Sequence, residues 1–465
     1  MEVHQINQSH IPNGGWGWVI VAAVAYINMF NQSLVSTFGL LFGEHLQSMN
    51  EETTGAALVT NLNSVFCSFS GLFIGPAIKN SSPRKVAFAG CLFTSTGLLI
   101  CALSTKLWHV IVGYSAFVGI GLGLIAPSSF MAINCYFTTR RGRAVGISLA
   151  GTGLGQMIVP HIVHALLERY DFKTAALVMS GLALNGLIGA SLFRPLPQAG
   201  RNLKEVKLLL DLNQDDTKNK LSEIEVNVRN PEEVPVLTPK TPTKKLLAKM
   251  FSRVSNAMDL VLLKDPVFWS IIIGMALVYT ATINFSMLFP YFLQFSAGIS
   301  RKDTAFCMSA VAGADILCRL LLPFLTDKLQ VPYRVMFLMG AAGMLVGRGV
   351  IAELNDFYGI VGMCILYGAS KAATIITNNL TISAYCSPEK LAGGLGLNMI
   401  SKGCMAITIG QLLAWVRDYS QSYPLCMHAQ NAVILFVLIL WIPELVYRYV
   451  KNRPSKETCD PASIP

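Results

Sequence analysis

The sequence has few charged residues. Only 13% of its 465 residues are Asp, Glu, Lys or Arg, whereas 53% are hydrophobic, and a soluble domain typically carries about 25% charged residues. This composition excludes a soluble enzyme, whose surface carries charged residues, and a disordered regulator, which has few hydrophobic residues. A membrane span needs about 20 apolar residues, so the hydrophobic residues suffice for about a dozen spans. We therefore expect a polytopic helical membrane protein.

Paired cysteine motifs and reactive clusters are also missing from the sequence. The eleven cysteines fall mostly inside hydrophobic segments, without the spacing that zinc ligands or a disulfide framework require. The sequence contains no nucleophile–base pair and no metal-ligand cluster, so it predicts no enzyme activity, no metal and no cofactor. The first fifteen residues lack an apolar core and a cleavage pattern, and the first span is therefore expected to act as its own insertion signal.

The net charge of +10 comes from 36 Lys and Arg against 26 Asp and Glu. Such an excess can indicate nucleic-acid binding, but here the basic residues cluster in alternate loops, which is how orientation in a bilayer is set. If both termini are cytoplasmic, 13 basic residues lie in the short inside segments and 6 in the outside loops. We therefore expect cytoplasmic termini, contact with membrane lipid and no nucleic-acid partner.

Hydrophobic segments long enough to cross a bilayer occupy residues 17–41, 54–78, 86–105, 109–135, 144–167, 174–193, 267–294, 303–326, 335–352, 357–385, 391–415 and 428–449. The polar stretch between the sixth and seventh segments holds 22 of the 62 charged residues. The sequence thus predicts an all-α membrane protein with an N-terminal six-helix half (1–193), a cytoplasmic linker (194–264), a C-terminal six-helix half (265–450) and a cytoplasmic tail (451–465). Within the linker we expect a short amphipathic helix from Thr243 to Leu263.

One loop sequence occurs in both halves. Gly75-Pro76-Ala77-Ile78-Lys79 follows the second span, and Leu322-Pro323-Phe324-Leu325-Thr326-Asp327-Lys328 follows the eighth. A basic-Val pair comes soon after in each case. Twelve spans in two halves, a long linker and a repeated loop resemble the layout of a major facilitator transporter.

Two motifs make this resemblance more specific. The first motif, at the start of the first span, reads Asn13-Gly14-Gly15-Trp16-Gly17-Trp18. The second begins with Tyr136-Phe137-Thr138-Thr139-Arg140-Arg141-Gly142-Arg143 and continues through Gly146 and Gly151 to Gly155. Both resemble signatures of the monocarboxylate transporter family (solute carrier 16 type). The chain departs from the family at Asn13, where an acidic residue is usual, and at Thr139, where lysine is usual.

These motif residues also have structural interpretations. Trp16 and Trp18 are expected to anchor the first span at the membrane interface. The small-residue spacing around Gly151 lets helices approach closely. Basic residues at the inner end of a span determine topology, and a gating role is the alternative for the three motif arginines Arg140, Arg141 and Arg143.

Ionisable side chains deep in a bilayer are costly unless they face a wet cavity or a partner, so each is a candidate functional residue. Asp315 and Arg319 are four residues apart and share one helix face. They resemble the family's span-eight pair, which implies a part in proton coupling and carboxylate binding. The alternative is a permanent ion pair without a ligand. Arg348 and Glu444 lie closer to span ends and are expected to snorkel to the interface.

Lys371 and Lys402 also lie near mid-span, at positions where the family does not generally have lysine. With Arg319 they make three cations against one anion, Asp315, an excess that is hard to accommodate in a dry interior. We therefore expect a central cavity between the two halves that binds an anion, with both lysines in its walls. Alternatively, each lysine donates to backbone carbonyls or to neighbouring Asn and Ser side chains.

The first span departs from the proton-coupled members of the family. They carry a lysine 23 residues beyond the acidic motif residue, and the same count from Asn13 ends at Ser36. A serine cannot take up a proton and then attract a carboxylate. Ser36 and Asn31 are predicted to face the charged residues across the cavity, although amides such as Asn31 also hold helices together.

The resemblance implies a transporter that moves small carboxylate-bearing solutes by alternating access. Its cargo would be an organic anion or a zwitterion, with a proton as co-substrate in the proton-coupled case. It also implies the plasma membrane and, as for some members, a single-span ancillary glycoprotein as partner. Two alternatives are a proton-independent facilitator of amino acids or aromatic metabolites, and a non-transporting membrane sensor with the same fold.

Overall fold

The computed structural model describes residues 14–49, 53–194, 260–329, 331–354, 356–420 and 422–451. Twelve helical segments in these ranges are long and apolar enough to cross a membrane. They are Trp16–Ser48, Leu58–Lys79, Pro83–Ala102, Leu107–Tyr136, Arg141–Arg169, Phe172–Ser191, Pro266–Ser296, Lys302–Leu325, Tyr333–Glu353, Phe357–Tyr385, Leu391–Arg417 and Tyr423–Leu445. The predicted all-α fold with twelve transmembrane helices is confirmed. Most of the predicted linker, with its amphipathic helix, lies outside the described residues.

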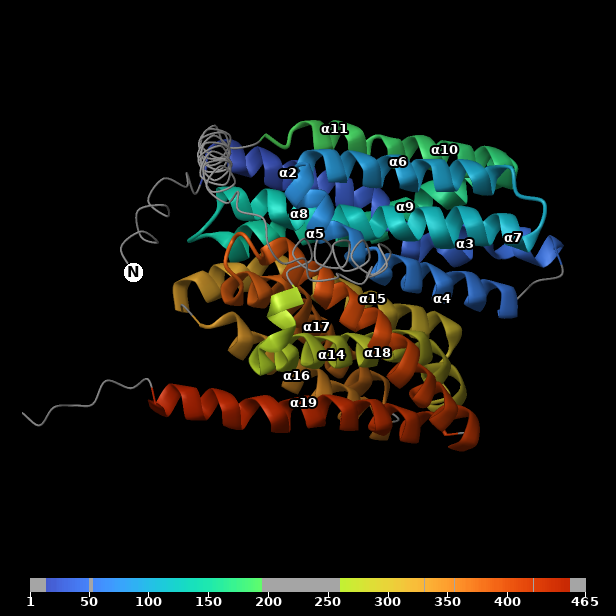
Figure 1. The fold of residues 1–465 in the computed structure, drawn as a ribbon. Helices are drawn as coiled ribbons and strands as arrows, with labels where there is room; N and C mark the ends of the chain where they lie inside the picture. Colours follow the sequence, from blue (N-terminus) through green and yellow to red (C-terminus); the bar gives the residue numbers. More distant parts are fainter. Residues whose placement is uncertain are drawn as a thin grey trace, which may run out of the picture. The chain divides into compact units, whose positions relative to one another are not determined.

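The helices group into two compact units (Figure 1). The first unit ends at Lys264 and also includes Cys386–Leu397; the second comprises Asp265–Tyr385 and the residues from Asn398 onward. Helices of the first unit are α2 (Trp16–Asn31), α3 (Leu34–Ser48), α4 (Thr53–Phe69), α5 (Gly71–Asn80), α6 (Pro83–Ala102), α7 (Leu107–Val110), α8 (Gly119–Tyr136), α9 (Arg141–Arg169), α10 (Phe172–Leu184) and α11 (Gly186–Ser191). A π-helical segment (Ile111–Val118) joins α7 to α8, and a 3₁₀ turn covers Leu260–Lys264.

The second unit contains longer helices. They are α14 (Pro266–Tyr291), which continues as a π-helical turn (Phe292–Ser296), α15 (Arg301–Leu329), α16 (Tyr333–Glu353), α17 (Phe357–Tyr385), α18 (Leu391–Ser420) from Asn398 onward, and α19 (Tyr423–Lys451). Figure 1 draws α19 in red beside α14 and α16, both of which it contacts. Its fully buried Trp441 fills the space above Gly274 of α14, where an added Cβ would lie 2.5 Å from the indole.

Three spans of the first unit, each predicted as one continuous helix, are interrupted at polar residues: Ser33, Ser70 and Asn185. Between α2 and α3, the Ser33 hydroxyl donates to the Met29 carbonyl at 2.6 Å. Between α4 and α5, the Ser70 hydroxyl donates to the Cys67 carbonyl at 2.7 Å. Such bonds back to the preceding turn compete with the backbone ladder and bend helices. After its break the first span continues to Ser48, beyond the predicted end at residue 41.

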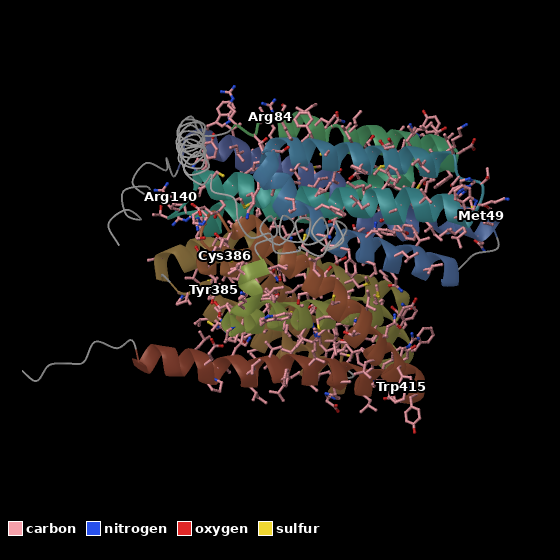
Figure 2. The ribbon with its side chains drawn as sticks, viewed as in Figure 1. Met49, Arg84, Arg140, Tyr385, Cys386 and Trp415 are labelled. Carbon is pink, nitrogen blue, oxygen red and sulfur yellow. The ribbon has the colours of Figure 1, made fainter. Side chains whose placement is uncertain are left out.

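The chain alternates direction in each unit, as a polytopic protein requires. In the first unit, Arg84 and Arg140 lie toward one end of the helices and Met49 lies toward the other (Figure 2). In the second unit, Tyr385 at the end of α17 and Trp415 near the end of α18 lie at opposite ends (Figure 2). The basic loops after the second and fourth spans therefore share one end of the first unit.

Close helix packing in the first unit depends on glycine. A Cβ at Gly151 of α9 would lie 2.2 Å from the Ala25 carbonyl oxygen of α2, and one at Gly155 would lie 2.1 Å from the Met29 carbonyl oxygen. No real Cβ sits so close to a backbone oxygen. The two helices can therefore pack at this separation only because both positions lack a side chain.

We expect Gly151→Ala to destabilise the protein by about 1–3 kcal/mol, because the added methyl group forces α2 and α9 apart. The matched control is Gly181→Ala in α10, where an added Cβ meets nothing within 4 Å and alanine favours the helix by about 0.5–1 kcal/mol. Thermal unfolding in detergent measures both variants. Equal melting temperatures for the two would contradict this packing.

Candidate functional site

A buried ion pair lies on α15. The Arg319 guanidinium donates two hydrogen bonds to the Asp315 carboxylate, from Nε to Oδ1 at 2.7 Å and from Nη2 to Oδ2 at 2.9 Å. The side chains share one helix face because they are one turn apart. Both residues are buried, with exposures of 4% and 5%. The planar fork of arginine suits this two-point contact with a carboxylate.

Lys371 of α17 reaches the same carboxylate. Its Nζ lies 3.5 Å from Oδ2 of Asp315, and 24% of its side chain is exposed. The helices approach closely one turn earlier, where a Cβ at Gly368 would lie 2.3 Å from the Val311 carbonyl oxygen. One carboxylate is therefore the counter-ion of two cations. Sequence reasoning paired Asp315 with Arg319 alone, since nothing in the sequence shows which face of α17 meets α15.

Lys402 of α18 lies in a second polar cluster of the same unit. Its Nζ donates to Oδ1 of Asn378 at 3.1 Å, and Nδ2 of Asn398 donates to the same oxygen at 3.1 Å. The ammonium group also lies 5.0 Å from the centroid of the Tyr279 ring, within range of a cation–π interaction. A neighbouring asparagine was the alternative partner expected for this lysine.

Both clusters lie along one face of α17. Lys371 and Asn378 are seven residues apart, which places them within about 20° around the helix and about 10 Å apart along it. Tyr367, one turn before Lys371, shares this face. The helix thus carries an aromatic ring, a lysine and the asparagine that holds a second lysine in one row.

Arg348 of α16 is fully buried, so the prediction that it snorkels to the interface is wrong. Its Nη1 donates to the Ala281 carbonyl at 3.2 Å and its Nη2 to the Thr282 hydroxyl at 3.3 Å. The guanidinium carbon lies 4.8 Å from the Phe285 ring centroid and 5.2 Å from that of Tyr367. The side chain turns inward, toward these groups of α14 and α17.

Glu444, also expected to snorkel, instead pairs with a residue of the same unit. Arg334 at the start of α16 donates to both its carboxylate oxygens, at 3.0 and 2.6 Å. The Arg334 guanidinium also lies 4.4 Å from the centroid of a Trp441 ring. This contact joins the first turn of α16 to the last part of α19.

Positive charge therefore exceeds negative charge inside the second unit. Among its described residues, one carboxylate lies deep within the spans, that of Asp315, while four side chains there carry positive charge: Arg319, Arg348, Lys371 and Lys402. Such an excess is expensive at low dielectric. An anion bound near these four side chains would lower this electrostatic cost.

The predicted first-unit residues have local partners. Asn31 is fully buried, and its Nδ2 donates to the carbonyls of Ile27 at 3.2 Å and Ala183 at 3.4 Å, which joins α2 to α10. Ser36 is exposed on α3 and donates to the Ser33 carbonyl at 2.7 Å. The two residues lie on different helices, α2 and α3. The predicted role of both residues at a shared cavity remains a prediction.

The two sequence motifs meet at one end of the first unit. Trp18 packs edge-on against Phe137, with 5.1 Å between ring centroids. The Trp16 indole donates to the Leu192 carbonyl at 3.1 Å and lies under the Arg194 guanidinium at 4.0 Å. These tryptophans therefore connect the ends of three spans through side-chain contacts, in addition to the interfacial anchoring that the sequence predicts.

The remaining motif residues lie at the N-terminal ends of α2 and α9. Gly15 precedes α2 with a φ of +58°, a conformation that favours glycine. The Gly14 carbonyl accepts a hydrogen bond from the Gly17 amide at 3.1 Å. Arg140 directly precedes α9, and Nε of Arg141 donates to the Phe137 carbonyl at 2.6 Å. Arg143 lies in the first turn of α9.

We expect Asp315→Asn to cost about 3–5 kcal/mol of stability, because it leaves a buried guanidinium without its counter-ion. Lys371→Met leaves the Asp315–Arg319 pair intact and removes a partly exposed cation, so its effect should be much smaller. Thermal unfolding of both variants in the same detergent shows which variant loses more stability. A larger loss for Lys371→Met would contradict the shared-carboxylate geometry.

Arg348→Met is expected to preserve or raise the melting temperature. Methionine fills a similar volume and removes the desolvation cost of a buried charge whose hydrogen-bond partners are neutral. Arg348→Lys is the matched control, since it keeps the charge but loses the two-point contact with Ala281 and Thr282. A stable lysine variant beside an unfolded methionine variant would show that the charge itself stabilises the unit.

Comparisons with known proteins agree with this architecture. A family model described as Major Facilitator Superfamily matches residues 19–410. "Monocarboxylate transporter 12-B" of Danio rerio is 24% identical over 460 residues, which cover 96% of this chain and 91% of that protein. "Monocarboxylate transporter 7" of Homo sapiens is 23% identical over 442 residues, with coverage of 89% and 83%. The resemblance to monocarboxylate transporters is thus confirmed.

A solved structure shows the same fold. The proton:xylose symporter XylE, bound to 6-bromo-6-deoxy-D-glucose, aligns with a TM-score of 0.65 and 13% identity, covering 94% of this chain and 96% of the symporter. This likeness concerns the fold alone. Since the family model covers most of a chain with twelve candidate membrane spans, the protein is a multi-pass membrane transporter that belongs to the Major Facilitator Superfamily.

Proposed function

We propose that this protein carries small carboxylate-bearing solutes across a membrane by alternating access. The observation that supports this proposal is the cluster in which one buried carboxylate, Asp315, serves both Arg319 and Lys371. The cluster has a net positive charge of one, so an added carboxylate would neutralise it. The names of the relatives, monocarboxylate transporters, point to the same class of cargo.

Each residue of the cluster has a distinct role in this proposal. Asp315 fixes the positions of both cations in the empty carrier. Lys371 is the partly exposed member, and its ammonium group can donate to a cargo carboxylate while it remains close to Asp315. Arg319 holds Asp315 in place and adds positive potential. Cargo binding then neutralises the cluster, which lowers the cost of moving it through a low-dielectric interior.

Facilitated transport without a proton fits the charges better than symport. A proton on Asp315 would release Arg319 and Lys371 but would also increase the positive excess inside the second unit. In addition, Ser36 stands where proton-coupled members of the family have a lysine, and a serine hydroxyl does not take up an additional proton at neutral pH. Symport, in which Asp315 takes up the proton, is the second candidate because the Asp315–Arg319 pair is of the kind that the family uses.

We assign the plasma membrane as the location and the cytoplasm to both termini. The orientation is supported by the basic residues, of which the short inside segments hold 13 and the outside loops hold 6. Arg84 and Arg140, two of these inside residues, lie toward the same end of the first unit (Figure 2).

Uptake of radiolabelled pyruvate and lactate into proteoliposomes tests the proposal. Lys371→Ala should reduce uptake by about 10- to 100-fold, because a charge-assisted hydrogen bond contributes about 1.5–3 kcal/mol. Arg319→Ala should also reduce uptake, because it removes the group that holds Asp315 in place. Lys302→Ala, which removes a positive charge from an exposed residue at the start of the eighth span, is the control and should leave uptake unchanged.

An inward proton gradient separates the two candidates. Facilitated transport predicts the same initial rate with and without the gradient, whereas symport predicts stimulation that Asp315→Asn abolishes. If none of the carboxylates tested enters, transport of this class is contradicted and the non-transporting sensor becomes the better explanation.

A further inference from the structure

We propose that the preferred cargo is a small dicarboxylate, with one carboxylate bound at Lys371, beside Arg319, and the other at Lys402. This inference rests on the proposed function, because it names the substrate class of the same site. It depends on three features of the second unit: two lysines held at separate points along one face of α17, the groups around Lys402, and the balance between the positive charges of the site and the negative charges of the cargo.

The two lysines are held at separate points along α17. Lys371 belongs to this helix, and Lys402 of α18 is hydrogen-bonded to Asn378 of α17 at 3.1 Å. The two points on α17 are about 10 Å apart along the helix and on the same face. Both lysines are partly exposed, whereas Asp315 and Asn378 that contact them are buried. Each lysine is thus partly exposed and also makes a contact with a buried polar side chain.

The surroundings of Lys402 suit a carboxylate. Its Nζ donates to the Asn378 amide oxygen, which Asn398 also approaches, and lies 5.0 Å from the centroid of the Tyr279 ring. An ammonium group has three donors, and its hydrogen bond to an ionised acceptor is about twice as strong as one to a neutral acceptor. A cargo carboxylate would therefore improve on the interactions that the protein provides here.

The charges balance for a dianion. Arg319, Lys371 and Lys402 carry three positive charges, and Asp315 with two cargo carboxylates supplies three negative charges. A monocarboxylate leaves one cation of this set without a counter-charge, and a zwitterion adds a cation of its own. The charge of Arg348 is not counted in this balance, because its guanidinium is hydrogen-bonded to a backbone carbonyl and a hydroxyl and lies against two aromatic rings. Its guanidinium contributes a fixed positive potential next to Tyr367, one turn from Lys371.

Matched pairs of acids test the inference in proteoliposomes at pH 7.5. The pairs are butyrate and succinate, valerate and glutarate, and hexanoate and adipate, and glutamate serves as the zwitterion-bearing analogue of glutarate. In the wild type, kcat/KM for the best dicarboxylate should exceed that of its monocarboxylate partner by about tenfold or more, as expected for one added charge-assisted contact. Glutamate should be transported less well than glutarate.

Lys402→Gln should lower dicarboxylate transport by about tenfold more than monocarboxylate transport, and so remove most of this preference, since the second contact is made by dicarboxylates alone. Lys402→Arg keeps the charge and should retain the preference, and Lys302→Gln is the control for loss of a distant charge. Gel-filtration profiles establish that each variant is folded. If Lys402→Gln does not fold, the comparison of Lys402→Arg with the wild type across the acid pairs takes its place.

The outcomes separate this inference from the proposed function. Equal transport of matched mono- and dicarboxylates, or equal losses for both in Lys402→Gln, would overturn the dicarboxylate inference and leave carboxylate transport standing. A Lys402→Arg variant that loses the preference while folded would also overturn it. If no acid of either kind enters, the proposed function itself fails.

Discussion

The interior of the second unit depends on one electrostatic contact, the carboxylate of Asp315 held between Arg319 and Lys371. Removing charges from water is expensive, and the cost is repaid only when geometry and hydrogen bonding are good. The two hydrogen bonds from Arg319 meet this condition. Lys371, at a longer distance and partly exposed, is the member of the cluster that a ligand can approach. In the proposed function, stability and cargo binding therefore depend on the same carboxylate.

Neutral interactions support this contact from the surrounding helices. Gly368 lets α17 approach α15 one turn before Lys371, and the Phe285 and Tyr367 rings cover the guanidinium of Arg348. In the first unit the same kind of close packing occurs between α2 and α9, where Gly151 faces the Ala25 carbonyl. Small residues let backbones meet in a membrane, where the hydrophobic effect does not drive helices together. Charged residues can then be placed within reach of one another.

The sequence predicted the spans well because a bilayer leaves few choices. Backbone groups in lipid must bond within their own helix, so hydropathy alone locates the spans. The four mid-span ionisable residues were found for the same reason. The pairing of Asp315 with Arg319 also follows from their spacing, but the contact of Lys371 with Asp315 does not, because helix rotation decides whether Lys371 meets Asp315 or a carbonyl. Arg348 was misjudged because distance from a span end says nothing of the helix face on which a side chain lies. The breaks at Ser33 and Ser70 follow from side-chain hydrogen bonds that hydropathy does not record.

Chemical rescue tests the central contact most directly. In Asp315→Ala, formate or acetate can enter the space left by the carboxylate and bind Arg319 and Lys371 as Asp315 does. Either anion should raise the melting temperature of this variant by several degrees, at concentrations where chloride and the wild-type protein show no such change. The Asp315→Ala/Arg319→Gln/Lys371→Met variant should not respond. Stabilisation that is absent in Asp315→Ala, or equal in all three proteins, would contradict a carboxylate-binding site built from these two cations.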